Sequence, residues 1–305
     1  MFKNTHAIPS RMSRRVETTR RLQIDLFPYV LLIPSAALIA LINLYPFATG
    51  FYYSLQDGTL LKSGAFVGFK NYLALPGMED FRHAIWFSIV FAFFNVFGSY
   101  LLGLALALLL NQNMPGRGFF RVALLVPWII PSIVSIVSWR WLIADQSGLV
   151  NVVLGWLRIG PIYFLSTENW ATFSVIVVKI WRSFPFMMLS VLAALQTINR
   201  EMYEAAAIDG AGRWQSFRYI TLPQIMPISI VLWILMTIWS VNDFETPWLL
   251  TQSGPSNATE NLMVIAYKYT FARNDVGTGT AIAFVSMLIM MTLAIMLLRR
   301  QRETT

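Results

Sequence analysis

Four ionisable side chains lie inside two long apolar runs of this sequence. Lys179 and Arg182 share one run, and Asp243 and Glu245 share the other. An ionisable residue is costly to hold at membrane depth, so each of the four is a candidate for a functional role. Lys179 and Arg182 are three residues apart, which places both side chains on one face of a helix.

The two charged pairs are predicted to lie at similar depth. At about 1.5 Å per residue, Lys179 is ~14 Å from the end of its helix near Trp170, and Asp243 is ~11 Å from the end near Leu250. Both pairs can therefore face a single cavity.

Three interpretations of these charges remain open. In the first, the two cations form structural ion pairs with the two carboxylates, because buried charges are normally paired. In the second, the polar groups hydrogen-bond a hydrophilic solute while Trp239 and Phe186 stack on it. In the third, one cation stays unpaired and holds an anionic group of the substrate, such as an acidic or phosphorylated sugar. The candidate solute-binding residues are Lys179, Arg182, Ser183, Phe186, Trp239, Asn242, Asp243 and Glu245.

Catalytic chemistry is not expected in this chain. Asp243 and Glu245 offer a carboxylate pair for a membrane-embedded transferase, but their i, i+2 spacing points them to different helix faces. The chain has no cysteine and only two histidines, His6 and His83, which are far apart, so neither a thiol site nor a histidine metal cluster is expected. The motif G-x-x-x-x-G-K-[ST] does not occur, so ATP binding through a P-loop is not expected.

The composition is that of an integral membrane protein. Of 305 residues, 56% are hydrophobic and 12% are charged, and the mean hydropathy is +0.58. Soluble domains carry about 25% charged residues. The net charge of +8 does not indicate nucleic-acid binding, because the basic residues cluster at the ends of the apolar runs, where they set orientation.

Six apolar runs are long enough to cross a bilayer, which takes about 20 residues. They cover about 27–49, 84–111, 119–144, 170–196, 223–250 and 277–298. The sequence therefore predicts an all-α membrane protein with a transmembrane domain over 27–300, a basic tail over 1–26 and a short tail over 301–305.

The distribution of Lys and Arg predicts the orientation. Fourteen lie on the side of the two termini and the 197–222 connection, and six lie on the other side, with three inside spans left out of the count. Because cytoplasmic segments carry the excess of basic residues, both termini and the 197–222 connection are predicted to face the cytoplasm.

Prolines and small residues predict local features of four spans. The third span contains Val126-Pro-Trp-Ile-Ile-Pro131, and Pro185 and Pro247 lie in the fourth and fifth. Proline kinks a helix, so we expect these spans to be bent. The sixth span opens with the small residues of Gly277–Ala283, which allow close helix approach.

The connection over 197–222 is polar and helix-prone. Glu201–Asp209 is rich in Ala, Met and Glu, which favour helix. Gly210 and Gly212 are expected to end that helix, and Pro223 suits the first turn of the next. The six charges of this connection sum to zero, so anionic lipid is not the expected partner. A short neutral helix fits a docking element for another protein, and an interfacial amphipathic helix is the alternative.

This connection resembles the coupling loop of permeases in bacterial ABC importers. That signature is Glu-Ala-Ala, three residues, Gly, nine residues, Ile, any residue and Leu-Pro. The sequence has Glu204-Ala205-Ala206, Gly210, Ile220 and Leu222-Pro223, and every spacing is met. Two more elements look like those of sugar-type permeases: Phe66-Val-Gly-Phe-Lys-Asn-Tyr72, and Trp181-Arg182 followed by Pro185-Phe186.

The resemblance implies a type I importer permease fold with six transmembrane helices in the bacterial cytoplasmic membrane. It implies one half of a carbohydrate pathway, with a second related permease, two ATPase subunits that bind ATP and Mg, an extracytoplasmic solute-binding protein and surrounding membrane lipid. Neither a cofactor in this chain nor a nucleic-acid partner is implied. The residues implied for ATPase coupling are Glu204, Ala205, Ala206, Asp209, Gly210, Ile220, Leu222 and Pro223.

The resemblance also places solute-binding positions on the two helices that flank the coupling loop, where the candidate residues above lie. By this comparison Arg182 is a general feature of the family, and Lys179 is more particular to this chain. The coupling motif does not separate a sugar from a glycerol-3-phosphate-like, polyol or amino-acid solute.

Overall fold

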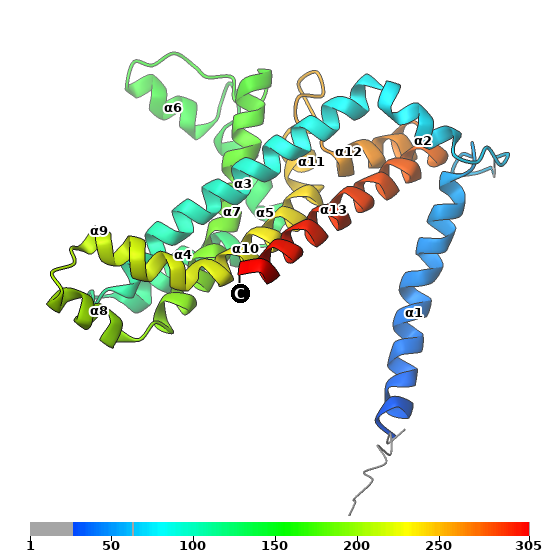
Figure 1. Cartoon of the computed structure of the whole chain (residues 1–305). Helices are drawn as coiled ribbons and strands as arrows, with labels where there is room; N and C mark the ends of the chain where they lie inside the picture. The colour runs from blue at the N-terminus through cyan, green and yellow to red at the C-terminus, as the bar shows by residue number, and fades with distance from the viewer. Residues whose placement is uncertain (1–26, 63, 305) are drawn as a thin grey trace, which may run out of the picture. The chain divides into compact units, whose positions relative to one another are not determined.

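The structure, a computed structural model, describes residues 27–62 and 64–304. The regular secondary structure of these residues is helical, apart from an isolated bridge between Gln56 and Phe66, and loops connect the helices (Figure 1). The basic tail predicted over 1–26 lies outside the described residues. Three single turns are η1 (Leu75–Gly77), η2 (Phe217–Thr221) and η3 (Lys268–Ala272), of which the last two are π-helical. The α-helices are α1 (Phe27–Ser54), α2 (Lys70–Ala74), α3 (Glu79–Asn111), α4 (Arg117–Ile129), α5 (Ser132–Leu142), α6 (Leu149–Trp156), α7 (Glu168–Gln196), α8 (Arg200–Ile208), α9 (Arg213–Ser216), α10 (Leu222–Val241), α11 (Glu245–Thr251), α12 (Leu262–Tyr267) and α13 (Val276–Thr304).

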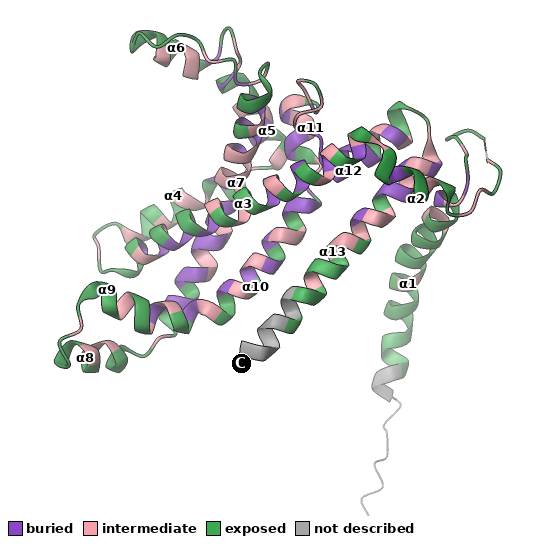
Figure 2. Ribbon diagram, turned by 45° about the horizontal axis from the view of Figure 1, so that its top comes forward, coloured by how far each residue is buried: buried purple, intermediate pink, exposed green. Residues whose placement is uncertain are grey.

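The chain divides into two compact units, residues 1–48 and 49–305. In the first unit, the described part of α1 exposes its apolar side chains, for example Leu31 and Leu41 (Figure 2). A helix that is apolar and exposed on all sides needs lipid or another protein around it. The account below concerns the second unit.

Five helical segments of the described chain are long and apolar enough to cross a membrane. They are Val30–Ser54, Glu79–Asn111, Glu168–Gln196, Arg213–Val241 and Val276–Met296. These segments coincide with five of the six predicted runs. The sixth predicted run, over 119–144, is present only if the bent pair α4 and α5 is counted as one span.

The third predicted span is bent, as its prolines indicate, but the bend is a complete break between two helices and not a kink within one helix. Helices α4 and α5 meet at an angle of 92°. Ile130 separates them in an extended conformation, with φ −64° and ψ 133°. Pro131 is the cause, because proline disfavours the helical conformation of the residue before it.

The fifth predicted span, over 223–250, also consists of two helices. Helix α10 ends at Val241, and α11 begins at Glu245. Pro247 lies in the first turn of α11, where proline is tolerated, so it does not kink a continuous helix there. Pro185, in contrast, lies inside the unbroken helix α7.

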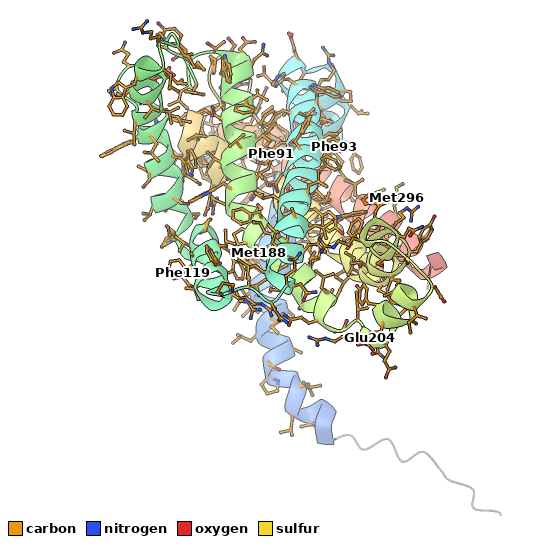
Figure 3. All side chains as sticks on the ribbon, turned by 90° about the vertical axis from the view of Figure 1, so that its left-hand side faces the viewer. Phe91, Phe93, Phe119, Met188, Glu204 and Met296 are labelled. Atoms are coloured by element: carbon orange, nitrogen blue, oxygen red, sulfur yellow. The ribbon has the colours of Figure 1, made fainter. Side chains whose placement is uncertain are left out.

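Helices α3 and α7 lie side by side and form the centre of the second unit, with α10 packed against both (Figure 1). The buried cluster between them includes Leu104, Met188 and Met236. Figure 3 shows Met188 directed between the helices, whereas Glu204 projects from the segment after α7. Gly103 sets the spacing, since a Cβ atom there would lie 2.7 Å from Met187 Cβ and 2.8 Å from the backbone nitrogen of Met188.

The small residues at the start of α13 allow close approach, as predicted. A Cβ atom at Gly277 would lie 2.0 Å from the Gln56 carbonyl oxygen, and one at Gly279 would lie 2.7 Å from the Thr270 backbone nitrogen. Gly68 precedes α2 with a φ of 60°, which glycine adopts readily. After this turn, the Asn71 amide donates to the carbonyl oxygens of Ser54 (2.9 Å) and Gln56 (2.8 Å). The element Phe66–Tyr72 thus fastens the end of α1 to α2.

We predict that Gly103→Ala destabilises the chain, because its methyl group would meet the backbone of α7. Overpacking of this kind costs about 1–3 kcal/mol. Gly118→Ala in α4 is the matched control, since a Cβ atom at Gly118 has nothing within 4 Å. Alanine favours helix over glycine, so the control is expected to be neutral or slightly stabilising. Thermal unfolding of the purified full chain would measure both, and equal effects of the two variants would contradict this packing.

Candidate functional site

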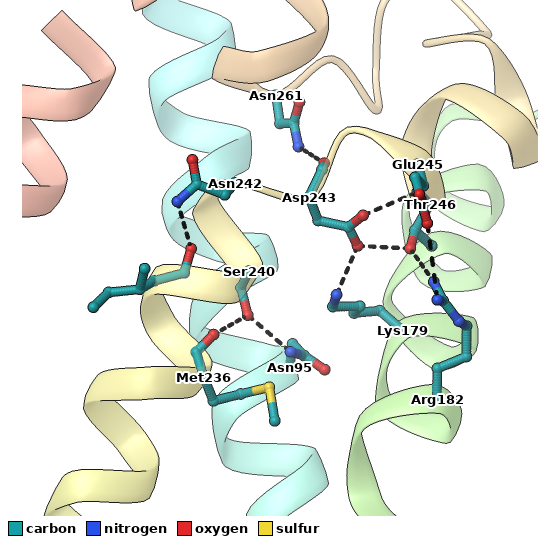
Figure 4. A network of polar contacts seen from close by, with 11 residues as sticks. Asn95, Lys179, Arg182, Met236, Ser240, Asn242, Asp243, Glu245, Thr246 and Asn261 are labelled. Atoms are coloured by element: carbon teal, nitrogen blue, oxygen red, sulfur yellow. Dashed lines mark hydrogen bonds and ion pairs between the residues drawn. The ribbon is translucent and has the colours of Figure 1, made fainter. Parts of the chain in front are cut away.

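A buried ion pair joins α7 to the break between α10 and α11. Lys179 Nζ lies 2.9 Å from Asp243 Oδ2, and the two side chains are 13% and 6% exposed. Figure 4 shows this pair at the centre of a polar network. The first of the three interpretations above therefore holds for Lys179 and Asp243: the pair is formed.

Thr246 links this pair to the second cation. Its hydroxyl donates to Asp243 Oδ2 (2.6 Å) and accepts a hydrogen bond from the Arg182 guanidinium (3.2 Å). The backbone N–H of Thr246 donates to Asp243 Oδ1 (3.1 Å), so Asp243 caps the first turn of α11. The Asp243 carboxylate thus pairs with Lys179 of α7 and accepts a backbone hydrogen bond in the first turn of α11.

Arg182 has a looser ionic partner than Lys179. Its guanidinium is 4.0 Å from Glu245 Oε2, and the Glu245 side chain is 51% exposed. An exposed pair at this distance contributes little, typically below about 1 kcal/mol. Glu245 therefore holds the Arg182 side chain, which is 18% exposed, only weakly.

Two further contacts fix the break between α10 and α11. The Asn261 amide donates to the Asp243 carbonyl oxygen (2.5 Å) and so ties the break to the N-terminus of α12. At the end of α10, the Asn95 amide of α3 donates to the Ser240 hydroxyl (2.8 Å). Contacts from two further helices, α3 and α12, therefore hold the break that carries Asp243 (Figure 4).

The predicted aromatic pair is also formed. The rings of Phe186 on α7 and Trp239 on α10 are 4.9 Å apart between centroids, and Trp239 is 44% exposed. Phe186 is four residues after Arg182, and Trp239 is four residues before Asp243. The rings therefore lie about one helical turn from the charged network.

Two of the predicted solute-binding residues, Ser183 and Asn242, take no part in the contacts of this network. Ser183 is buried, with 7% of its surface exposed. Asn242 is exposed, but its amide donates to the Ile238 carbonyl oxygen (3.1 Å) and contacts Met290 Sδ of α13 (2.9 Å). Asn242 therefore faces α13 rather than Lys179.

The segment that resembles a coupling loop forms an exposed helix. Helix α8 starts after Asn199, whose side chain accepts the Glu201 backbone N–H (3.1 Å), and it ends before Gly210, which has a φ of 82°. The predicted helix and its glycine stop are thus confirmed. Glu204, Ala205 and Asp209 are exposed and Ala206 is half-buried, and the apolar side chain of Ile208 is 86% exposed.

The second half of this motif belongs to the next span. Ile220 lies in the π-helical turn η2, and Leu222 and Pro223 begin α10. The Tyr203 hydroxyl lies 2.9 Å from the Thr221 hydroxyl, which fastens α8 to η2. Because Arg213–Val241 is one continuous helical segment, α8 is connected to the helix that ends next to Asp243.

Three residues of this site were not predicted from the sequence. Thr246 is three residues after Asp243, a spacing typical of a helix cap, and Asn261 directly precedes the apolar start of α12. Trp128 lies next to Pro127, and its ring is 5.9 Å from that of Phe186. Among the described residues, no group of three or more His, Cys, Asp or Glu side chains is arranged to hold a metal ion.

Comparison with known proteins assigns the family. A family model described as "Binding-protein-dependent transport system inner membrane component" matches residues 99–302. The trehalose/maltose transport system permease protein MalF of Thermococcus litoralis is 34% identical over 272 residues, which cover 89% of this chain and 92% of the relative. The sulfoquinovosyl glycerol transport system permease protein SmoG of Agrobacterium fabrum is 34% identical over 276 residues, which cover 90% of each chain.

A solved structure has the same fold. It is the crystal structure of a bacterial ABC transporter involved in the import of the acidic polysaccharide alginate, and one of its chains matches with a TM-score of 0.81 and 24% identity over 92% of this chain and 96% of that chain. This likeness concerns the fold alone. With the family match over 99–302 and the extended identity to two permeases, the chain belongs to the family of inner membrane components of binding-protein-dependent transport systems, as an ABC transporter permease.

Proposed function

We propose that this chain forms half of the transmembrane pathway of an ATP-driven importer for a carbohydrate. A second related permease completes the pathway, two separate ATPase subunits bind ATP and Mg, and an extracytoplasmic solute-binding protein delivers the solute. The chain itself carries out no catalysis. It lies in the bacterial cytoplasmic membrane with both termini in the cytoplasm, as its basic residues indicate.

The observation that carries this proposal is the connection between the two sites. Helix α8 is exposed and is fastened through Tyr203 and Thr221 to the segment Arg213–Val241. That segment ends beside Asp243, whose carboxylate holds Lys179. A movement imposed on α8 is therefore passed along one helix to the charged network.

The ATPase would bind the exposed side of α8. Its exposed apolar residue Ile208 suits an apolar pocket in the partner, and the turn at Gly210 fixes how far α8 projects. ATP-driven closure of the ATPase subunits would displace α8 and rock the spans between inward-facing and outward-facing states. This is a two-state helix bundle biased by ligands at both ends.

The solute would bind on the side of α7 and α10 that carries Arg182, Phe186 and Trp239. Arg182 supplies hydrogen-bond donors beside the exposed Glu245, and the two rings supply an apolar surface. A sugar ring presents both polar edges and apolar faces. The curated relatives named above are permeases for trehalose/maltose and for sulfoquinovosyl glycerol, and the structural neighbour imports an acidic polysaccharide, which supports a carbohydrate over an amino-acid or polyol solute.

Arg182 favours an acidic sugar within this class. Lys179 is neutralised by Asp243 at 2.9 Å, whereas Arg182 faces an exposed carboxylate at 4.0 Å. A solute carboxylate would displace Glu245 from the guanidinium, and planar Arg–carboxylate pairs are among the strong charge-assisted contacts. Lys179 thus remains a structural cation, and Arg182 is the one available to the solute.

The proposal is tested with the complex reconstituted in lipid vesicles together with its binding protein. ATP hydrolysis is measured with maltose, trehalose and an alginate oligosaccharide, and with glycerol 3-phosphate and methionine as solutes of other classes. Stimulation by a sugar supports the proposal. Copurification without any ATPase, or stimulation only by a non-sugar solute, would overturn it.

We predict that Arg182→Gln raises the alginate concentration needed for half-maximal stimulation by at least about tenfold, because a hydrogen bond to a charged group is lost. Half-saturation by a neutral disaccharide should change less. Arg140→Gln is the matched control, because Arg140 is an exposed residue of α5 outside the network. If both arginine variants behave alike, Arg182 does not contact the solute.

We predict that Gly210→Val uncouples ATP hydrolysis from uptake. The added side chain meets no steric obstacle, because a Cβ atom at Gly210 has nothing within 4 Å. The substitution is disruptive because Gly210 has a φ of 82°, which a β-branched residue does not adopt without strain. Gly210→Asn should keep coupling, because asparagine tolerates this conformation. Gly155→Val in α6 controls for a bulky residue at an open glycine. The ratio of solute imported to ATP hydrolysed is the measurement, and a normal ratio in Gly210→Val would argue against this role.

A further inference from the structure

Three aromatic rings from three helices meet beside the charged network. Trp128 of α4 lies 5.9 Å from Phe186 of α7, and Phe186 lies 4.9 Å from Trp239 of α10, measured between ring centroids. The planes are tilted by 47° and 56°, so neither contact is a closed stack. Trp128 is 51% exposed and Trp239 is 44% exposed, which leaves part of each indole free.

The break in the third span places Trp128 in this group. Pro127 is buried, and helix α4 ends at Ile129 because Pro131 holds Ile130 in an extended conformation. Trp128 therefore lies in the last turn of α4, which packs against α7. In a continuous helix over 119–144, the residues after Trp128 would continue along the axis of α4. Instead, α5 begins at Ser132 at an angle of 92° to α4.

The ring cluster of Trp128, Phe186 and Trp239 lies next to the polar network. Phe186 follows Arg182 by four residues, so the two lie one turn apart on the same side of α7. Trp239 lies in the last turn of α10, just before the break that holds Asp243. The surface therefore combines charged hydrogen-bonding groups with an apolar aromatic platform one turn further along. A solute ring with a polar edge and an apolar face, such as a sugar ring, can contact the charged groups and the aromatic rings at the same time.

We infer that Trp128 is a specificity-determining residue of the solute site, and that its indole packs against the apolar face of a sugar ring beside Phe186 and Trp239. This inference rests on the proposed function and adds a third helix to the solute-binding surface. It assigns the broken third span a binding role in addition to its role in packing. Lipid or a partner permease on the exposed indole are the other occupants that the experiment distinguishes.

The test uses Trp128→Leu and Trp128→Phe in the reconstituted complex with its binding protein. Leucine keeps an apolar side chain of moderate size but removes the aromatic ring, whereas phenylalanine keeps a ring. Trp86→Leu is the matched control, because Trp86 lies on α3, is 66% exposed and is not part of this ring cluster. The probes are maltose, trehalose and an alginate oligosaccharide, used over a range of concentrations.

We expect Trp128→Leu to raise the half-saturating concentration of the stimulating sugar about fivefold, the size of one aromatic packing contact, with the maximal rate retained. Trp128→Phe should restore most of the affinity, and Trp86→Leu should have no effect. Basal ATP hydrolysis and copurification of the ATPase should be unchanged in all three variants, which separates a solute contact from a fault in assembly.

Three outcomes would overturn the inference. One is an unchanged half-saturating concentration in Trp128→Leu, which would leave the indole to lipid. The second is loss of a copurifying permease or ATPase, which would make Trp128 an assembly contact. The third is failure of the unmodified complex to respond to any of these sugars. That result would contradict the proposed function itself, and it is distinguishable because it is seen without any substitution at Trp128.

Discussion

The ion pair between Lys179 and Asp243 is the interaction on which the rest of this arrangement depends. Two charges that are 13% and 6% exposed are costly to desolvate, and they persist only because each neutralises the other at 2.9 Å. Asp243 also lies in the break between α10, which ends at Val241, and α11, which begins at Glu245. Its side chain accepts from the Thr246 backbone N–H in the first turn of α11, and its backbone carbonyl oxygen accepts from the Asn261 amide. One residue thereby contacts α7, α11 and the start of α12.

This pair also determines what remains available for a solute. With Lys179 neutralised, Arg182 and the exposed rings of Trp128 and Trp239 form the open side of the network. At the opposite end of the same helical segment, α8 projects with Ile208 exposed. The exposed helix α8 is fastened to one end of the segment Arg213–Val241 by the Tyr203–Thr221 contact, and the charged network lies at the other end. In the proposed function, this segment couples the ATPase partner to the solute.

The sequence was most informative where a local pattern has a single physical meaning. Apolar length predicted six spans, five of which correspond to long apolar helices of the described chain. The Ala- and Glu-rich stretch predicted α8, and Gly210 predicted its end. The pairing of Lys179 with Asp243 was one of several open alternatives, because spacing gives depth along a helix but not which neighbour is in reach. The prolines predicted a bend in the third span but not its size of 92°, since proline effects range from a kink to a full interruption, depending on packing. Asn261 and Trp128 reach the site through tertiary contacts that no local pattern reveals.

The measurement that tests this account most directly is a double-mutant cycle on the ion pair. Lys179→Met, Asp243→Asn and the double variant would be compared by thermal unfolding of the purified permease in its complex. Each single variant leaves a buried charge without its partner and should lose about 3–5 kcal/mol, whereas the double variant removes both charges and should lose much less than the sum. Additive losses, to within about 0.5 kcal/mol, would contradict a direct interaction between the two side chains.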